Sequence, residues 1–179
     1  MATRNGDDEE EAGGADRFLV LLRHGIAEEK TEAKPDEERG LTPEGHARMK
    51  MIAKGLERAL PKAQAIYSSP LLRAVQTALW VSKGYRSRIK VKTTDALIPG
   101  ASPSEFAEFI RTIKERRTII VGHEPNLSED VVELVGLPSG DGIELKKGGC
   151  YGVRVRADGS AVLEWLLSPR ILRKLGEGE

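Results

Sequence analysis

The chain has 179 residues and carries 28 basic and 28 acidic side chains, so its formal net charge is zero. This length suits one domain with a substantial core, and the balanced charge leaves no overall field that would attract nucleic acid or an anionic membrane. The single cysteine, Cys150, allows no intrachain disulfide, and we expect it to be a small buried residue. No apolar stretch approaches the ~20 residues of a membrane span, and the acidic N-terminus has no apolar signal core. We therefore expect a cytoplasmic protein.

The first 16 residues are rich in glycine and acidic side chains, including the run Asp7-Asp8-Glu9-Glu10-Glu11. Such a composition buries too little apolar surface to fold, so we interpret residues 1–16 as a disordered tail, with an interaction arm as the less favoured alternative. Residues 17–179 are expected to form a single domain, because no internal repeat or second unit is visible. From Phe18 onward, strand and helix patterns alternate, which favours an α/β fold.

Short apolar runs predict the strands of this domain, at residues 18–22, 64–67, 90–93, 118–122, 151–156 and 161–167. The last two flank Asp158-Gly159, a strong hairpin signal, so this end of the sheet should be antiparallel. The earlier strands are separated by helices and should be parallel. The predicted architecture is a three-layer α/β/α fold with a central mixed, mainly parallel sheet.

A proline after a capping residue marks the predicted helix starts. Thr42-Pro43 and Ser69-Pro70 each place a hydroxyl at the cap and a proline at the first helical position. Residues 102–105 form a capping box whose helix should run to about Glu115, and a fourth helix should start at Pro125. The expected apolar faces are Ala47, Met51, Leu56 and Leu60 in the first helix, Leu72, Val75, Leu79 and Trp80 in the second, and Val131, Val132 and Val135 in the fourth.

Polar side chains follow two predicted strands where those strands end. Arg23-His24-Gly25 comes directly after the first strand, and His123 follows the fourth. Open α/β sheets bind ligands at the carboxyl ends of their strands. A cation there can hold a phosphate, and an imidazole can act as a nucleophile if a turn carbonyl holds one ring nitrogen and the other is free. Each histidine taken alone could instead be a solvated or hydrogen-bonded loop residue.

Arg73 falls in the first turn of the helix predicted after Ser69. An arginine at this positive end of the helix dipole is unfavourable by ~0.3–1 kcal/mol, but a bound anion would reverse the sign. The alternative is an exposed arginine whose stem covers apolar surface. The third histidine, His46, lies inside the helix after Pro43 and is expected at the surface.

Four segments occur in a specific order along the chain. From Phe18 to about Pro169 the sequence resembles the histidine phosphatase superfamily, also called phosphoglycerate mutase-like, and most of all its SixA-type phosphohistidine phosphatase branch. The segments that carry the resemblance are Arg23-His24-Gly25, Leu41-Thr42-Pro43-Glu44-Gly45, Ser68-Ser69-Pro70-Leu71-Leu72-Arg73-Ala74-Val75-Gln76-Thr77-Ala78 and Val121-Gly122-His123-Glu124-Pro125-Asn126-Leu127-Ser128.

This resemblance implies a role for each polar residue of the motifs. His24 would attack phosphorus and become phosphohistidine, and water would then hydrolyse this phosphoenzyme. Arg23 and Arg73 would hold the phosphoryl oxygens, and His123 would bind the phosphoryl group and stabilise the transition state. No metal and no organic cofactor is implied. Arg39 is a further candidate for a phosphate or substrate contact, with a solvated loop arginine as an equal alternative.

The sequence departs from many members of the superfamily at Pro99. Members that cleave phosphate esters often carry a Glu or Asp general acid in this region, two residues after a leucine, and proline cannot donate a proton. The nearest carboxylate is Asp95. An alcohol leaving group needs such an acid, which is worth ~10²–10⁴-fold. Imidazole protonates near ~6.5 and can take its proton from solvent, so a P–N substrate fits this departure.

We therefore expect a phosphohistidine-bearing protein, such as a phosphotransfer domain, as the substrate of a monomeric enzyme. The segment between His24 and Arg73 is short, so no large cap would cover the site. The second hypothesis is a small-molecule phosphomonoesterase, in which Asp95, Glu105 or Glu124 would supply the proton. A mutase is disfavoured because the chain looks too short to enclose its intermediate. A non-catalytic phosphate-binding module is the third hypothesis, and the intact His24 argues against it.

Overall fold

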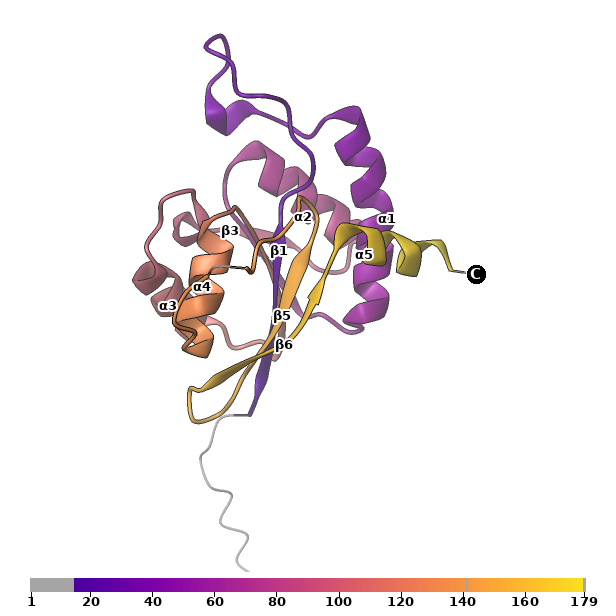
Figure 1. Ribbon diagram of the computed structural model, residues 1–179. Helices are drawn as coiled ribbons and strands as arrows, with labels where there is room; N and C mark the ends of the chain where they lie inside the picture. Colours follow the sequence, from indigo (N-terminus) through magenta and orange to yellow (C-terminus); the bar gives the residue numbers. More distant parts are fainter. Residues whose placement is uncertain (1–14, 141, 179) are drawn as a thin grey trace, which may run out of the picture.

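The computed structural model describes residues 15–140 and 142–178, so most of the predicted tail lies outside the described residues. The described chain forms six strands, five α-helices and two short 3-10 turns (Figure 1). In chain order these are β1 (Arg17–Arg23), η1 (Asp36–Glu38), α1 (Pro43–Ala59), β2 (Ala65–Ser68), α2 (Leu72–Gly84), β3 (Val91–Thr93), η2 (Asp95–Leu97), α3 (Pro103–Thr112), β4 (Arg117–Gly122), α4 (Asn126–Val135), β5 (Cys150–Val155), β6 (Ala161–Leu167) and α5 (Pro169–Glu177).

The strands form one mixed sheet in the order β3-β2-β4-β1-β5-β6. β3, β2, β4 and β1 are parallel neighbours, and β5 and β6 continue the sheet as an antiparallel pair. The predicted α/β class and the mixed, mainly parallel sheet are confirmed. β1 lies at the centre of the sheet with β4 and β5 on either side, and it is the strand that ends in Arg23-His24.

Helices cover both faces of the sheet, which gives the three predicted layers (Figure 1). Alternate residues of β1 point to opposite faces, as in any strand. Val20 and Leu22 belong to the core under α1, α2 and α5, and Leu19 and Leu21 belong to the core under α3 and α4. Because both faces are buried, β1 is a continuous apolar run. Cys150, fully buried in the first of these cores, is the small buried residue that the sequence predicts.

The helix starts are mostly as predicted, but several helix faces are not. Thr42 caps α1 and the capping box opens α3, which ends at Thr112 rather than near Glu115. Ser69 does not cap α2, because that helix starts at Leu72. In α1 the predicted Leu56 and Leu60 are buried, but Ala47 is exposed and the core also includes Met49, Ile52 and Ala53. α2 exposes Leu72 and Leu79, and of the three valines predicted for α4 only Val131 is fully buried.

Two further details differ from the sequence prediction. The expected surface residue His46 is half-buried, and its Nδ1 accepts a hydrogen bond from Trp80 Nε1 at 2.9 Å. The C-terminal helix α5 was not predicted, although Ser168-Pro169 repeats the cap-plus-proline signal and Ser168 accepts a hydrogen bond from the Ile171 amide. Among the described helices, none is long and apolar enough to cross a membrane.

Candidate active site

The two strand-end histidines lie side by side at the carboxyl edge of the sheet. β1 and β4 are parallel neighbours with Arg23 opposite Gly122, and the His24 amide donates to the Gly122 carbonyl at 3.1 Å. The next residue on each strand is therefore a histidine, and the two ring centroids are 5.1 Å apart. His24 is 7% exposed and His123 is 3% exposed. These two buried imidazoles define the candidate site.

Gly25 fixes the orientation of the His24 ring. The Gly25 carbonyl lies 2.7 Å from His24 Nδ1, and a carbonyl can only accept, so the Nδ1–H donates and Nε2 carries no proton in the neutral ring. The Gly25 amide donates to Thr77 Oγ1 at 3.0 Å, which holds this peptide from α2. A side chain at position 25 would place its Cβ 2.7 Å from Met49 Cγ, so close packing against α1 favours glycine here.

Both imidazoles are neutral at neutral pH. Burial lowers the pKa of His24 to about 4, and the nearby Arg73 and Arg23 charges act in the same direction against the Gly25 hydrogen bond. Burial also lowers the pKa of His123 to about 3, with a further contribution from His24. A neutral His24 with a free Nε2 is the protonation state that a nitrogen nucleophile requires.

Two arginines reach the same edge of the sheet. Arg73, in the first turn of α2, is only 3% exposed, and its Nη1 and Nη2 donate to the backbone oxygen and Oδ2 of Asp36 at 2.8 and 2.9 Å. Arg23, at the end of β1, donates through Nη1 to the Leu145 carbonyl and lies 3.6 Å from Glu144. The sequence did not predict Asp36 or Leu145 as partners of these arginines, because each lies far along the chain from the arginine that it contacts.

Several buried nitrogens at this edge have no partner within the protein. The described residues contain five buried side-chain nitrogens without a hydrogen bond, and four of them are Arg23 Nε, Arg73 Nε and both ring nitrogens of His123. An unpaired buried polar group costs ~1–3 kcal/mol, so such a concentration at one place indicates a ligand site. Guanidinium groups match the geometry of phosphate oxygens. The arrangement can therefore bind a tetrahedral oxyanion next to His24.

Arg39 is linked to the site residue Arg73 through Asp36. Its Nε donates to Asp36 Oδ1 at 2.8 Å and its Nη1 donates to the Glu28 carbonyl. The candidate phosphate contact therefore binds the carboxylate that in turn contacts Arg73. Among the described residues, no group of three or more His, Cys, Asp or Glu side chains is placed to hold a metal ion.

The three carboxylates considered as proton donors occupy different environments. Glu105 is exposed and accepts from the amide and hydroxyl of Ser102 in the capping box of α3. Glu124 accepts from the Ser128 amide and hydroxyl and from the Leu145 amide, at 2.9 to 3.2 Å. Both are thus used to hold backbone segments. Asp95 is exposed at the start of η2, and Pro99 follows that turn.

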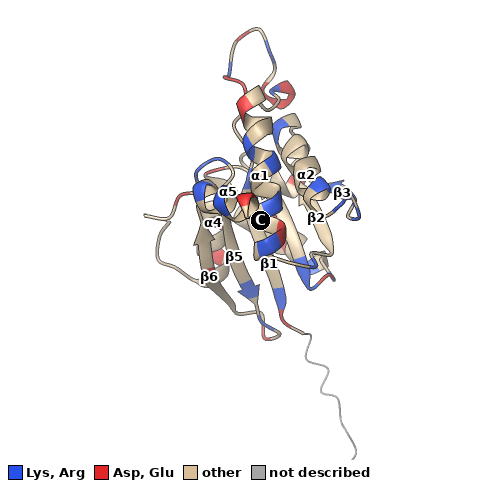
Figure 2. Cartoon of the chain, turned by 90° about the vertical axis from the view of Figure 1, so that its right-hand side faces the viewer, with Lys and Arg blue, Asp and Glu red and all other residues tan. Residues whose placement is uncertain are grey.

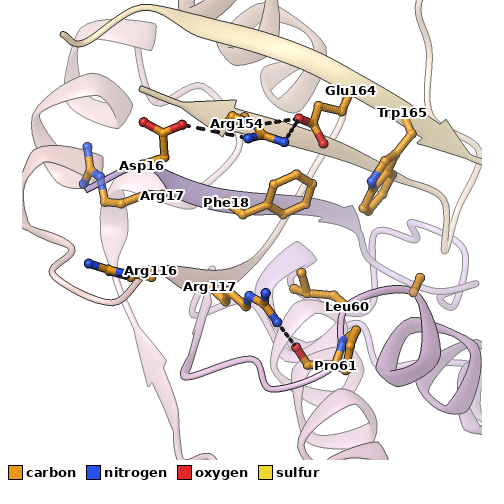
Figure 3. A pocket seen from close by; sticks show the side chains of 11 residues that line it. Asp16, Arg17, Phe18, Leu60, Pro61, Arg116, Arg117, Arg154, Glu164 and Trp165 are labelled. Atoms are coloured by element: carbon orange, nitrogen blue, oxygen red, sulfur yellow. Dashed lines mark hydrogen bonds and ion pairs between the residues drawn. The ribbon is translucent and has the colours of Figure 1, made fainter. Parts of the chain in front are cut away.

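Two cavities lie at opposite edges of the sheet. One, of about 750 Å³, lies between α4 and a loop segment that includes Gly142, Ile143 and Glu144, and it borders the candidate site at Arg23. The other, of about 460 Å³, lies at the opposite edge, near the start of β1 (Figure 3). Its arginines mostly bind the protein itself, for example Arg117 to the Pro61 carbonyl and Arg154 to Glu164. We place the chemistry at the first edge, where the unpaired nitrogens are.

The chain is similar to a known protein family and to several known proteins. Residues 19–98 match the family model of the histidine phosphatase superfamily (branch 1). An uncharacterised protein of Picosynechococcus sp. is 30% identical over 139 residues, which covers 76% of this chain and 84% of the relative. The protein histidine phosphatase SixA complexed with tungstate has a similar structure, with a TM-score of 0.78 and 20% identity over 87% of this chain and 99% of that one. A mycobacterial glucosyl-3-phosphoglycerate phosphatase is also similar, with a TM-score of 0.68 and 16% identity over 86% of this chain and 99% of that one.

These matches specify the class of the protein. The chain belongs to the histidine phosphatase superfamily and is a phosphatase of that superfamily. The similar structures include a protein phosphatase and a small-molecule phosphatase, so the fold is shared by both kinds of enzyme.

Proposed function

We propose that this protein hydrolyses phosphohistidine on a protein substrate through a covalent intermediate on His24. The observation that carries the proposal is the His24 ring, which is neutral, holds its proton on Nδ1 against Gly25 so that Nε2 carries none, and lies at the sheet edge that also holds the unpaired arginine and histidine nitrogens. Phosphoryl transfer depends above all on positioning and charge neutralisation, and these groups supply both.

The reaction has two steps. In the first, His24 Nε2 attacks phosphorus, a new P–N bond forms, and the P–N bond to the substrate imidazole breaks. The leaving imidazole takes a proton from solvent. In the second step water attacks the phosphoenzyme, the His24 P–N bond breaks, and inorganic phosphate leaves. Arg23 and Arg73 hold the phosphoryl oxygens in both steps, and a His123 N–H hydrogen-bonds the group in the transition state.

The choice of a P–N bond is supported by the carboxylates near the site. Pro99 offers no proton, and Glu105 and Glu124 already accept hydrogen bonds from the backbone segments they hold. An imidazole leaving group does not need a dedicated acid, since its own pKa is near ~6.5. The cavity beside Arg23 lies at the sheet edge, where a phosphorylated side chain from a second protein could enter.

Trapping the intermediate tests this mechanism. Enzyme mixed with a ³²P-labelled histidine-phosphorylated phosphotransfer domain and quenched within milliseconds should carry label that is stable in alkali and lost in acid, as expected of phosphohistidine. Peptide mapping should place the label on His24, and His24→Ala should carry none. Label on another residue, or equal turnover by His24→Ala, would reject the mechanism.

A small-molecule phosphomonoesterase is the second candidate, because the mycobacterial phosphatase shares the fold. In this case Asp95 is the carboxylate to test, since it is exposed and the other two hold the backbone. Asp95→Asn should then abolish ester cleavage. Under the leading proposal the same change leaves phosphohistidine hydrolysis within about twofold of wild type, because no acid is needed.

A further inference from the structure

Asp36 contacts the phosphate-site arginine from a loop that belongs to none of the sequence motifs. It opens η1, within the loop that rises above the carboxyl ends of the strands and carries charges of both signs (Figures 1 and 2). Its backbone oxygen accepts from Arg73 Nη1 at 2.8 Å, and its Oδ2 accepts from Arg73 Nη2 at 2.9 Å. The Arg73 side chain is 4% exposed, so this contact fixes a buried guanidinium.

The contact uses only part of the guanidinium. Arginine has five N–H donors in a rigid plane, and Asp36 takes one on each Nη. The Nε–H and one N–H on each Nη remain, and Nε is buried without a partner in the protein. Asp36 therefore fixes the plane of Arg73 while leaving its Nε edge available to an oxyanion. A free arginine would have to lose rotamer freedom at the moment of reaction.

Asp36 is itself held by the loop. Arg39 Nε and Nη2 both lie 2.8 Å from Asp36 Oδ1, and Arg39 Nη1 donates to the Glu28 carbonyl. Partial burial raises the pKa of the Asp36 carboxyl, but the hydrogen bonds from Arg73 and Arg39 outweigh it and lower the pKa below its ordinary value. The carboxylate is thus ionised at neutral pH, and both of its contacts are charge-assisted.

We infer that Asp36 is a positioning residue for phosphoryl transfer, which acts on the transition state through Arg73. This inference rests on the proposed role of Arg73 but not on the identity of the leaving group. A misoriented Arg73 guanidinium raises the free energy of the transition state most, because that is where charge shifts on the phosphoryl oxygens. Because the carboxylate also offsets part of the arginine charge, its loss does not weaken ground-state binding of an anion. The expected signature is therefore a fall in kcat without a loss of oxyanion affinity.

The test compares Asp36→Ala and Asp36→Asn with Glu37→Gln, a matched control that removes an exposed carboxylate from the same turn. With p-nitrophenyl phosphate, Asp36→Ala should lower kcat about tenfold, the range of one charge-assisted hydrogen bond, while the inhibition constant of tungstate changes less than about threefold. Asp36→Asn should lie between, since its amide oxygen still accepts from Nη2. Glu37→Gln should match wild type.

A second readout separates positioning from general damage and from failure of the proposed function. In ¹⁵N spectra, the Arg73 Nε–Hε signal, identified by its loss in Arg73→Lys, should be sharp in wild type and Glu37→Gln and exchange-broadened in Asp36→Ala, while backbone amide signals remote from this loop stay unchanged. This readout needs no substrate, so it holds even if wild type cleaves no phosphohistidine. An unchanged Arg73 signal, an unchanged kcat, or a higher kcat in Asp36→Ala would overturn the inference.

Discussion

His24 is neutral because of where the fold places it. β1 carries it to the buried carboxyl edge of the sheet, where burial and the charges of Arg73 and Arg23 disfavour a protonated ring. The Gly25 carbonyl holds Nδ1, and Thr77 holds the Gly25 amide. Each of these contacts acts on one atom of the ring or of the adjacent peptide, and together they select one tautomer.

We predict that the His24 ring stays neutral, with its proton on Nδ1, from pH 8 down to about 5, because its pKa is lowered to about 4. ¹⁵N NMR of the imidazole nitrogens measures this directly, with His24→Gln to assign the signals. A histidine in the unfolded chain titrates near ~6.5, so between pH 6.5 and 4 the unfolded state binds more protons than the folded state. The His24 contribution to stability therefore falls as the pH drops through this window, by at most ~1.4 kcal/mol per pH unit. A midpoint near 6.5 in the folded protein would contradict the prediction.

Sequence could identify His24, Arg23, Arg73 and His123 as candidates because each stands at a strand end or a helix start, which are local signals. Asp36 and Thr77 could not be found in this way. Asp36 lies 37 residues from Arg73, and Thr77 lies 52 residues from Gly25, so only the tertiary fold brings these pairs together. Arg39 was noticed in the sequence, yet its contacts lead to Asp36 and Glu28.

At the scale of elements, α1 and α5 pack with their backbones in contact. A Cβ on Gly55 would lie 1.8 Å from the Leu172 carbonyl oxygen, and a Cβ on Gly176 would lie 2.2 Å from that of Met51. Backbone atoms cannot move aside as a flexible side chain can. The two glycines therefore allow α5 to lie close against α1 and cover one face of the core, which includes Leu172.

We predict that Gly55→Ala destabilises the protein by separating α5 from α1. Overpacking costs ~1–3 kcal/mol, which exceeds the gain of up to ~1 kcal/mol from the better helix propensity of alanine. Urea unfolding should show a free energy of unfolding lower by about 2 kcal/mol. Gly140→Ala is the matched control, because its Cβ would meet only Val132 Cγ2, at an ordinary 3.5 Å. A Gly55→Ala variant as stable as wild type would contradict this account of the helix pair.

At this scale, the strands were predictable from the sequence, whereas the contact between α1 and α5 was not. Strand positions and their parallel or antiparallel character were predictable, because short apolar runs and the Asp158-Gly159 turn are local features. The buried face of α1 was predicted only in part: Leu56 and Leu60 are buried but Ala47 is exposed, since the apolar and small residues of this helix allow more than one phase. Gly55 is buried against α5, and a helix that was not predicted could not be used to place it.

At the scale of the whole molecule, one edge of the sheet collects every group of the proposed mechanism. β1 and β4 supply the histidines and Arg23, α2 supplies Arg73, and the loop above them supplies Asp36. Helix macrodipole and guanidinium charge both favour an anion there. Of the carboxylates considered as acids, Glu105 and Glu124 hold backbone segments, so the proposed selectivity for a P–N bond depends on the whole site and not on one residue.

The most direct test of the central claim is a paired turnover measurement on a histidine-phosphorylated phosphotransfer domain and on ethyl phosphate, with wild type, His24→Ala and Asp95→Asn. We predict that wild type has a kcat/KM for phosphohistidine at least ~10²-fold above that for the alkyl ester, the range that a missing general acid accounts for. His24→Ala should lose both activities, and Asp95→Asn should retain the first. Efficient hydrolysis of ethyl phosphate that disappears in Asp95→Asn would contradict the account and make the protein a phosphomonoesterase with a proton donor.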